Sequence, residues 1–340
     1  MRSFGIAKRI PANGSACRTL AAVFGLMAWM AISSPAAEPD YGGLDVIRVR
    51  PNFYMIAGAG SNVSVQIGQD GVVLVDAGSE AASDRVIAAI RKITELPTRY
   101  VIDTDADADH VGGNGKVAKA GQTIFTNALG NANFGNAMTN GGAASILAHD
   151  SILRRMSAPT GKKSEFPVES WPTEAFLRNR WYIRMNDEPI EIIYQPSAHS
   201  DADSFVFFRK SDVVAAGDIL DTTRFPVIDV ANGGSIQGEI DALNRLIELA
   251  IPPGPFIYEG VGTYVIPGHG RPCEQLDVVD YRDMVVIVRD VIADMIKQGM
   301  TLEQIKAAHP ARPYETEYGT VEGSTSAFVE SVYKSLTAKK

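Results

Sequence analysis

The sequence predicts a mixed α/β fold in which two similar β-rich halves pack face to face. Three observations support this prediction. Short apolar segments separated by turn residues recur twice, each series is followed by a helical pattern, and the last third of the chain has apolar residues at helical spacing. Sheets and helices with one apolar face must bury that face against another layer, so we expect the two halves to share a core.

Strand-like segments separated by turn residues open the first half, which is typical of an antiparallel meander. A helix with one apolar face follows, and Ser79 is its expected N-cap. A further apolar strand then ends directly before an acidic motif, at a position where loops commonly carry functional groups. The predicted strands are 46–49, 53–56, 63–67, 72–75 and 99–102, and the helix contains Val86, Ile87, Ile90 and Ile93.

Residues 126–187 are the least regular stretch of the chain. Gly, Asn and Ala are frequent up to residue 144, a helical pattern runs from Ser145 to Met156, and residues up to Trp171 are expected to form a loop. We interpret the stretch as an insertion that forms one wall of a pocket.

The second half repeats the order of strands and helix. Its elements are strands at 190–194, 204–208 and 213–216, a helix at 236–250 and a strand at 264–266. A long helical pattern then ends at Gly299, and Thr301 with Gln304 is a capping box for another helix. We therefore predict a main domain over residues 38–275 and a helical extension, residues 276–340, packed on the same domain.

The first 37 residues have the features of a signal peptide. A basic leader without acidic residues precedes the apolar run 19–32, and small residues follow it up to Ala37. The apolar run is short for a membrane span. We expect cleavage after Ala36 or Ala37 and a periplasmic or secreted protein.

Composition and charge indicate which classes of binding partner to expect. The chain is 45% hydrophobic and carries a formal net charge of −8, which disfavours nucleic acid and anionic membrane surfaces. We expect a small-molecule substrate, no nucleic acid, and no stable membrane association after the leader is removed. Cys273 is the single cysteine outside the leader, so a metal site must use His and carboxylate ligands. The oligomeric state is not predicted.

An acidic motif with one histidine follows the strand at 99–102 directly, and two more histidines lie in loop-like contexts at His199 and His269. The motif reads Asp105, Ala106, Asp107, Ala108, Asp109 and His110. Carboxylates crowded in this way repel one another and retain protons unless a cation binds among them. The motif therefore predicts a metal centre.

The order of these parts resembles the metallo-β-lactamase superfamily over about Asp45 to His269. That family carries His-x-His-x-Asp-His after a strand, a later lone His, an Asp in a Gly-Asp pair, and a final His in Pro-Gly-His-Gly. The matching positions here are Asp105-x-Asp107-x-Asp109-His110, His199, Gly217-Asp218 and Pro267-Gly268-His269-Gly270, and Val75-Asp76-Ala77-Gly78 also matches. The resemblance implies an αββα sandwich with metals in a groove at the sheet edges.

The resemblance also implies two metal sites. The positions of Asp105, Asp107 and His199 hold the first metal in the family, those of Asp109, His110 and His269 hold the second, and Asp218 bridges them. Two histidines of the first site are aspartates here, so four carboxylates neutralise two dications. Zinc is the expected metal, one or two per chain, while the oxygen-rich first site also suits manganese, iron, magnesium or calcium.

We expect a metal-dependent hydrolase in which a metal-bound hydroxide attacks an ester, thioester, lactone or amide bond, including that of a β-lactam. Asp109 would orient or deprotonate the water, and His199 would ligate metal or relay a proton. The alternative is an altered-site homologue with a single or hard-metal centre, little hydrolase activity, and a binding or sensing role. A calcium loop is excluded, because a frame begun at Asp105 lacks the required Gly and Glu.

Overall fold

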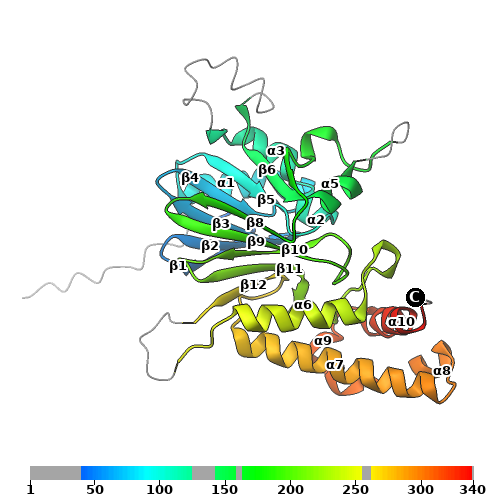
Figure 1. Cartoon of the computed structure of the whole chain (residues 1–340). Coiled ribbons are helices and arrows are strands. Elements are labelled where there is room, and N and C mark those ends of the chain that lie inside the picture. Colours follow the sequence, from blue (N-terminus) through cyan, green and yellow to red (C-terminus); the bar gives the residue numbers. More distant parts are fainter. Residues whose placement is uncertain (1–39, 125–141, 158–162, 255–261, 339–340) are drawn as a thin grey trace, which may run out of the picture. The chain divides into compact units, whose positions relative to one another are not determined.

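Two β-sheets lie face to face at the centre of the structure, and helices cover their outer faces (Figure 1). The computed structural model describes residues 40–124, 142–157, 163–254 and 262–338. One buried cluster contains side chains of both sheets, among them Phe53 and Val73 of the first sheet and Val206 and Phe208 of the second. The predicted αββα sandwich is confirmed.

The first sheet has seven strands in the order of the sequence, antiparallel up to β4 and parallel from β4 onward. The antiparallel part confirms the predicted meander. The strands are β1 (Asp45–Arg50), β2 (Phe53–Ala59), β3 (Ser61–Gly68), β4 (Gly71–Val75), β5 (Thr98–Ile102), β6 (Ser145–His149) and β7 (Glu174–Phe176).

The second sheet has five strands in the order β12-β11-β10-β9-β8, and only the β11–β12 pair is parallel. The strands are β8 (Arg180–Met185), β9 (Glu188–Gln195), β10 (Asp203–Phe208), β11 (Val213–Asp221) and β12 (Tyr264–His269). The strands predicted from the second half of the sequence are confirmed, and β11 continues beyond its predicted end to Asp221.

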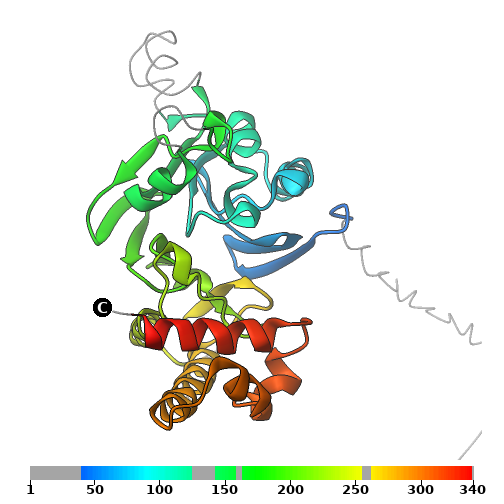
Figure 2. The same ribbon diagram turned by 90° about the vertical axis from the view of Figure 1, so that its right-hand side faces the viewer.

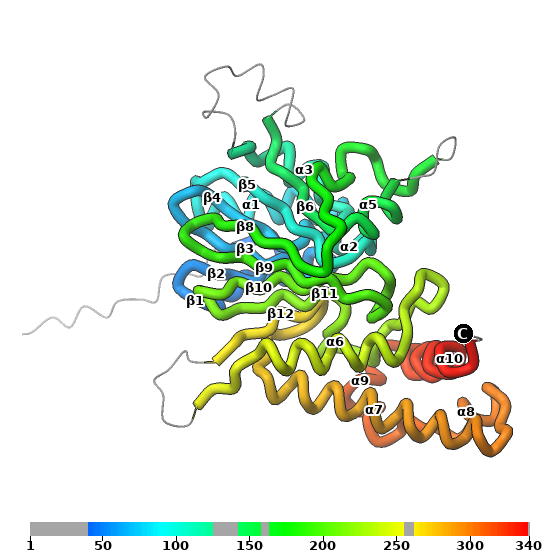
Figure 3. The backbone as a smooth tube through the Cα atoms, in the orientation of Figure 1, coloured from blue at the N-terminus to red at the C-terminus, as the bar shows by residue number. Residues whose placement is uncertain are grey.

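Helices cover both outer faces of the sandwich (Figure 3). The first sheet is covered by α1 (Ser83–Ile93) and α3 (Asn114–Ala120), and the second by α6 (Ile236–Leu249), α7 (Gln275–Lys297), α8 (Leu302–Ala307) and α10 (Ser324–Thr337). The shorter helices are α2 (Ala108–Val111), α5 (Asp150–Met156) and α9 (Glu315–Tyr318). Within the described residues, no helix is both long and apolar enough to cross a membrane.

Because side chains alternate along each strand, one strand packs against two layers, the opposite sheet on one face and a helix on the other. In β4, Val73 and Val75 lie between the sheets, whereas Val72 and Leu74 pack toward α1. Successive side chains of a strand point to opposite faces, and both faces of this sheet are covered, so the strand is apolar throughout. The C-terminal helices share a core with the outer face of β10 and β11.

The structure corrects three local predictions. Ser145 to His149 is a buried strand paired with β5, and only Asp150 to Met156 is helical. A short apolar run has no periodicity that separates strand from helix. Ser79 does not cap the helix, because its hydroxyl donates to the carbonyl of Ala59. Three strands lie within 126–187, so much of this stretch belongs to the sheets and is not an insertion; its segments 126–141 and 158–162 lie outside the described residues.

The helix α6 begins in close contact with the loop that carries His199. A Cβ added to Gly238 would lie 1.8 Å from the carbonyl oxygen of Ser197, and one added to Gly234 would lie 2.1 Å from that of His199. Only glycine therefore allows the helix to approach this loop.

We predict that Gly238→Ala destabilises the protein although alanine is the better helix former. Relief of the contact with Ser197 requires a backbone shift, and overpacking of this kind costs about 1–3 kcal/mol. Urea unfolding followed by circular dichroism measures the effect. Asp241→Ala, at an exposed position of the same helix, is the control and should change stability by less than about 0.5 kcal/mol. Equal stability of the Gly238→Ala variant and the parent would contradict the close contact.

Candidate metal centre

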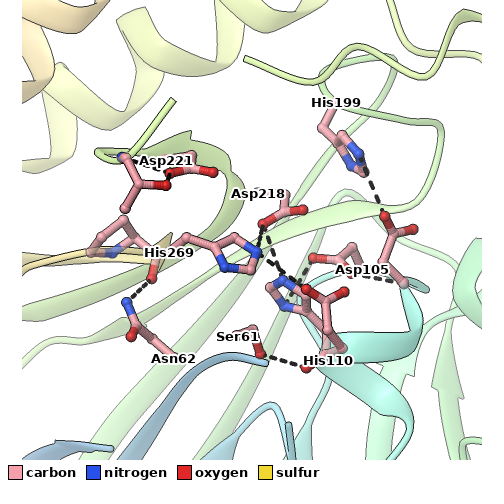
Figure 4. A network of polar contacts seen from close by, with 12 residues as sticks. Ser61, Asn62, Asp105, His110, His199, Asp218, Asp221 and His269 are labelled. Atoms are coloured by element: carbon pink, nitrogen blue, oxygen red, sulfur yellow. Dashed lines mark hydrogen bonds and ion pairs between the residues drawn. The ribbon is translucent and has the colours of Figure 1, made fainter. Parts of the chain in front are cut away.

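The seven predicted site residues meet at one edge of the two sheets (Figure 4). The motif from Asp105 to His110 follows β5 and continues into α2. His199 follows β9, and the other two lie on neighbouring parallel strands, Asp218 on β11 and His269 on β12. Their ligand atoms form three groups, within each of which all atoms lie within 4.8 Å of one another. These groups are Asp109 with His110 and His269, Asp105 with His110 and Asp218, and Asp107 with His199 and Asp218.

Two imidazoles converge on one oxygen of Asp218. Nε2 of His110 lies 3.1 Å and Nε2 of His269 lies 3.2 Å from Oδ1 of Asp218, and Nε2 of His269 lies 3.3 Å from Oδ2 of Asp109. Tetrahedral zinc, with bonds of about 2.0–2.1 Å, separates its ligand atoms by roughly 3.3 Å. In addition, Nε2 of His269 is buried without a hydrogen bond of good geometry. The donor set of the second site therefore fits a tetrahedral metal.

A second carboxylate orients His110. Nδ1 of His110 lies 3.0 Å from Oδ2 of Asp76, and Asp76 in turn accepts hydrogen bonds from the backbone N–H and the hydroxyl of Thr104. A proton held on Nδ1 leaves the lone pair of Nε2 for a metal. Asp76 has a φ of 62°, a conformation that Asp and Asn tolerate better than most residues. Asp76, which the sequence offered as part of a segment that matches the family, therefore supports the metal-site histidine His110.

His199 is oriented in the same way by Asp203. Nδ1 of His199 lies 3.3 Å from Oδ1 of Asp203, and Nε2 lies 3.7 Å from Oδ2 of Asp107. Asp203 is further held by the N–H and hydroxyl of Ser200. Asp201, two residues after His199, is half exposed and lies near Arg155.

The two aspartates of the first site differ in their surroundings. Asp105 is buried; its Oδ1 accepts from the N–H of Asp107 and its Oδ2 accepts from the hydroxyl of Thr104. The side chain of Asp107 is partly exposed and accepts no hydrogen bond from the described residues. The first site thus offers one imidazole and several carboxylates, a set that suits harder cations than zinc.

Charge is unevenly distributed over the site. Burial alone would raise the pKa of Asp218, but His110, His269 and His199 hold it well below its usual value. Burial, together with the neighbouring carboxylates, raises the pKa of Asp105 well above its usual value. Burial opposes protonation of His199 and His269, yet their carboxylate partners raise the pKa values to about 10 and about 9. Protons occupy the positions that a metal would take, and metal binding would release them.

Several supporting residues were not identified from the sequence. Thr104 contacts Asp76, Asp105 and His110 through one hydroxyl. Asn62 donates to the carbonyls of Pro267 and Gly270 on either side of His269, and Ser61 donates to the carbonyl of Asp109. For Ser61 and Asn62, the sequence indicated a supporting role only through their position as a polar pair at the start of an apolar strand. Their partners lie 48 to 208 residues away along the chain.

Comparison with known proteins agrees with this geometry. The model of the metallo-beta-lactamase superfamily matches residues 57–257, more than half of the chain. The chain belongs to the metallo-β-lactamase superfamily. No curated protein matches it by sequence.

Solved structures of enzymes share the fold. A double mutant of the sec-alkyl sulfatase PisA1 is 14% identical, with a TM-score of 0.62 over 86% of this chain and 50% of that chain. The inverting sec-alkylsulfatase Pisa1 from Pseudomonas sp. is 12% identical, with a TM-score of 0.57 and the same coverage. A metallo-beta-lactamase from Pontibacter korlensis is 12% identical, with a TM-score of 0.50 over 72% of this chain and 99% of that one. The chain thus spans about half the length of the alkylsulfatases, and at these identities the likeness shows the fold alone.

We predict that Asp76→Asn lowers metal affinity. Asn tolerates the positive φ. However, its amide group replaces one of the two carboxylate oxygens that accept hydrogen bonds from His110 and Thr104. Loss of such a hydrogen-bonding partner behind a metal ligand typically lowers metal affinity about 10- to 100-fold. Competition with a chromophoric chelator measures the change. Asp84→Asn, whose side chain is 85% exposed, is the control. An unchanged affinity in the Asp76→Asn variant would contradict the role of Asp76.

We also predict that joint Asp105→His and Asp107→His substitutions raise bound zinc by about one per chain. The change restores the imidazoles that the family carries at these positions, and imidazole suits zinc better than a crowded set of carboxylates. Elemental analysis measures the stoichiometry, and circular dichroism checks the fold. Asp107→His alone, at a partly exposed position, is the milder companion variant. A folded double variant with unchanged zinc would show that these residues do not form the first site.

Proposed function

We propose that the protein is an exported metal-dependent hydrolase that acts on an ester, thioester, lactone or amide bond, β-lactams included. The convergence of His110 and His269 on Asp218, with Asp109 beside them, carries this proposal. Members of the superfamily to which the chain belongs are mostly hydrolases. The leader in residues 1–37 supports export to the periplasm or beyond.

Asp109, His110, His269 and Asp218 would hold the principal metal, for which zinc suits the two imidazoles and two carboxylates. When bound, a divalent metal lowers the pKa of water and stabilises negative charge on the oxygen of a scissile bond. Asp105, Asp107 and His199 would hold a second, harder cation beside it.

Asp109 and His199 are the proposed proton-transfer groups. The side chain of Asp109 is partly exposed, and the imidazole of His269, 3.3 Å away, lowers the pKa of Asp109, so the carboxylate stays ionised and can orient a water molecule and accept its proton. His199 is fixed at Nδ1 by Asp203, which directs Nε2 toward the site; where the second cation is not bound, Nε2 can instead deliver a proton to a leaving group.

Sulfate esters belong in the same substrate screen. The sulfatase whose parent and double-mutant structures share the fold acts on secondary alkyl sulfates according to its name, and a metal that stabilises negative charge on a leaving oxygen serves that bond as well. Esters, thioesters, lactones, β-lactams and alkyl sulfates should therefore be tested together.

We predict that His269→Ala lowers metal content and abolishes hydrolysis of whichever substrate the screen identifies. The variant removes one of the two imidazoles of the principal site, and a loss of at least about 100-fold in kcat/KM is expected from loss of the metal. Elemental analysis and initial rates measure the two effects on the same preparation.

The control is His309→Ala, because the side chain of His309 is 63% exposed and lies beside Glu315, outside the metal centre. Full activity of His269→Ala would refute the site assignment. The other outcome is that the parent protein binds one metal, or only calcium or magnesium, and hydrolyses none of the substrates. In that case the hypothesis of an altered-site homologue with a binding or sensing role replaces the hydrolase hypothesis.

A further inference from the structure

A groove with an apolar floor lies between α10 and the loop that follows β11. One part has a volume of about 370 Å³ and an adjoining part about 540 Å³, and both are lined by Ile228, Ala327 and Ser331. The floor contains Phe225 and Phe328, whose rings stack with centroids 5.3 Å apart. These volumes lie in the range of small-molecule binding sites.

The rim of the groove is mixed: it includes Glu322 and Lys334 but also two exposed valines. Val227 and Val321 line it and are 44% and 45% exposed. Exposed apolar residues that gather around a concave surface mark a binding site more often than singly scattered ones do. Among the described residues, nothing covers this rim.

The same loop connects the groove to the metal centre. At its start, the N–H of Thr222 donates to the carbonyl of His269, and near its end the N–H of Asp229 donates to the carbonyl of His199. The loop therefore spans the distance between two of the metal-site histidines, and residues between these anchors line the groove. A ligand in the groove lies along a segment that borders both histidines.

Arg224 stands at the junction of the groove and the centre. It lines the groove, and its Nε donates to Asp221, which is the register partner of His269 in the β11–β12 pair. Its side chain is 30% exposed, and its two terminal nitrogens have no hydrogen-bonding partner among the described residues. Asp218 and Asp109 also contribute to raising the pKa of Arg224 after Asp221, against the effect of burial. A positive charge therefore lies close to the metal-binding carboxylates.

One wall of the groove is not part of the family match. The superfamily model ends at residue 257, whereas Ala327, Phe328 and Ser331 lie on α10. Figure 2 shows α10, in red, crossing the near side of the lower half of the molecule. The groove is therefore formed by this chain's helical extension together with a loop of the shared fold.

We propose that this groove binds the apolar chain of an anionic substrate whose hydrolysable bond lies at the metal centre, with Arg224 attracting the negative charge. The proposal rests on the proposed hydrolase function and deepens it by naming the substrate class, an amphiphile with a linear or branched hydrocarbon chain. The guanidinium of Arg224 at the inner end of the groove and the continuity of the loop with both histidines support this occupant over others. The acidic lining residue Glu330 is paired with Lys334 and leaves the apolar floor free for the chain.

Isothermal titration calorimetry of the full protein with decanoate, hexanoate and decyltrimethylammonium tests the proposal without any need for turnover. Burial of each methylene strengthens binding by up to about fourfold. Decanoate should bind at one site per chain and at least tenfold more tightly than hexanoate, which lacks four methylenes. Decyltrimethylammonium has the same chain with the opposite charge and should bind more weakly than decanoate.

Two neighbouring exposed positions on α10 provide a matched pair of variants. Ala327 lines the groove and Ser326 does not. Ala327→Trp fills the groove and should weaken decanoate binding at least tenfold, whereas Ser326→Trp should leave it within twofold. Arg224→Gln should weaken binding of decanoate about three- to tenfold and should strengthen that of decyltrimethylammonium, because the same positive charge repels the cation.

Equal effects of Ala327→Trp and Ser326→Trp, or the absence of decanoate binding, would overturn the proposal. A parent protein that is dimeric in sedimentation and becomes monomeric in the Ala327→Trp variant would also overturn it, because a second copy would then occupy the groove. These outcomes leave the metal-centre tests with His269→Ala unaffected. Conversely, decanoate binding that responds as predicted in a protein without hydrolase activity would separate the groove from the proposed function.

Discussion

The site depends on the contacts of the Asp218 carboxylate, because side chains from three parts of the chain meet there. His110 reaches it from the motif after β5 and His269 from the neighbouring strand β12, both with Nε2 at hydrogen-bonding distance from the same oxygen. This approach needs glycines on both sides. Gly217 has a φ of 56°, and a Cβ on Gly268 would lie 2.3 Å from Oδ1 of Asp218. The backbone is shaped to bring acid and imidazoles together.

The fold can tolerate this concentration of buried carboxylates only if positive charge balances them or some of them keep their protons. Asp76, Asp103, Asp105 and Asp203 are all buried around the centre with Asp218. Asn114 donates to both oxygens of Asp103, and backbone N–H groups or hydroxyls serve the others. Hydrogen bonds of this kind offset part of the desolvation of a carboxylate but do not neutralise it. Protonated imidazoles, or metal ions in place of their protons, complete the balance. Metal affinity and the stability of this edge of the sandwich are therefore linked.

The sequence predicted the parts whose evidence is local. The period-two apolar pattern of β3, the capping box of α8 and the acidic motif can each be recognised within a few residues. The strand β6 was mistaken for a helix because its five residues are all buried in a parallel sheet and show no alternation. The supporting role of Thr104 depends on Asp76, and that of Asn62 on the loop around His269; both were missed because contacts over long sequence separations leave no local pattern.

The two aspartates that depart from the family pattern have separate consequences. Asp105 satisfies both of its oxygens locally, one with the N–H of Asp107 and the other with Thr104, so it stabilises the turn that leads into α2. Asp105→His therefore removes two hydrogen bonds of this turn. Asp107 has no such task and faces Nε2 of His199 from the partly exposed side of the site. Its carboxylate is therefore the one that sets the charge offered to a second cation. The departure at Asp105 concerns the shape of the loop, and the departure at Asp107 concerns which ion the first site binds.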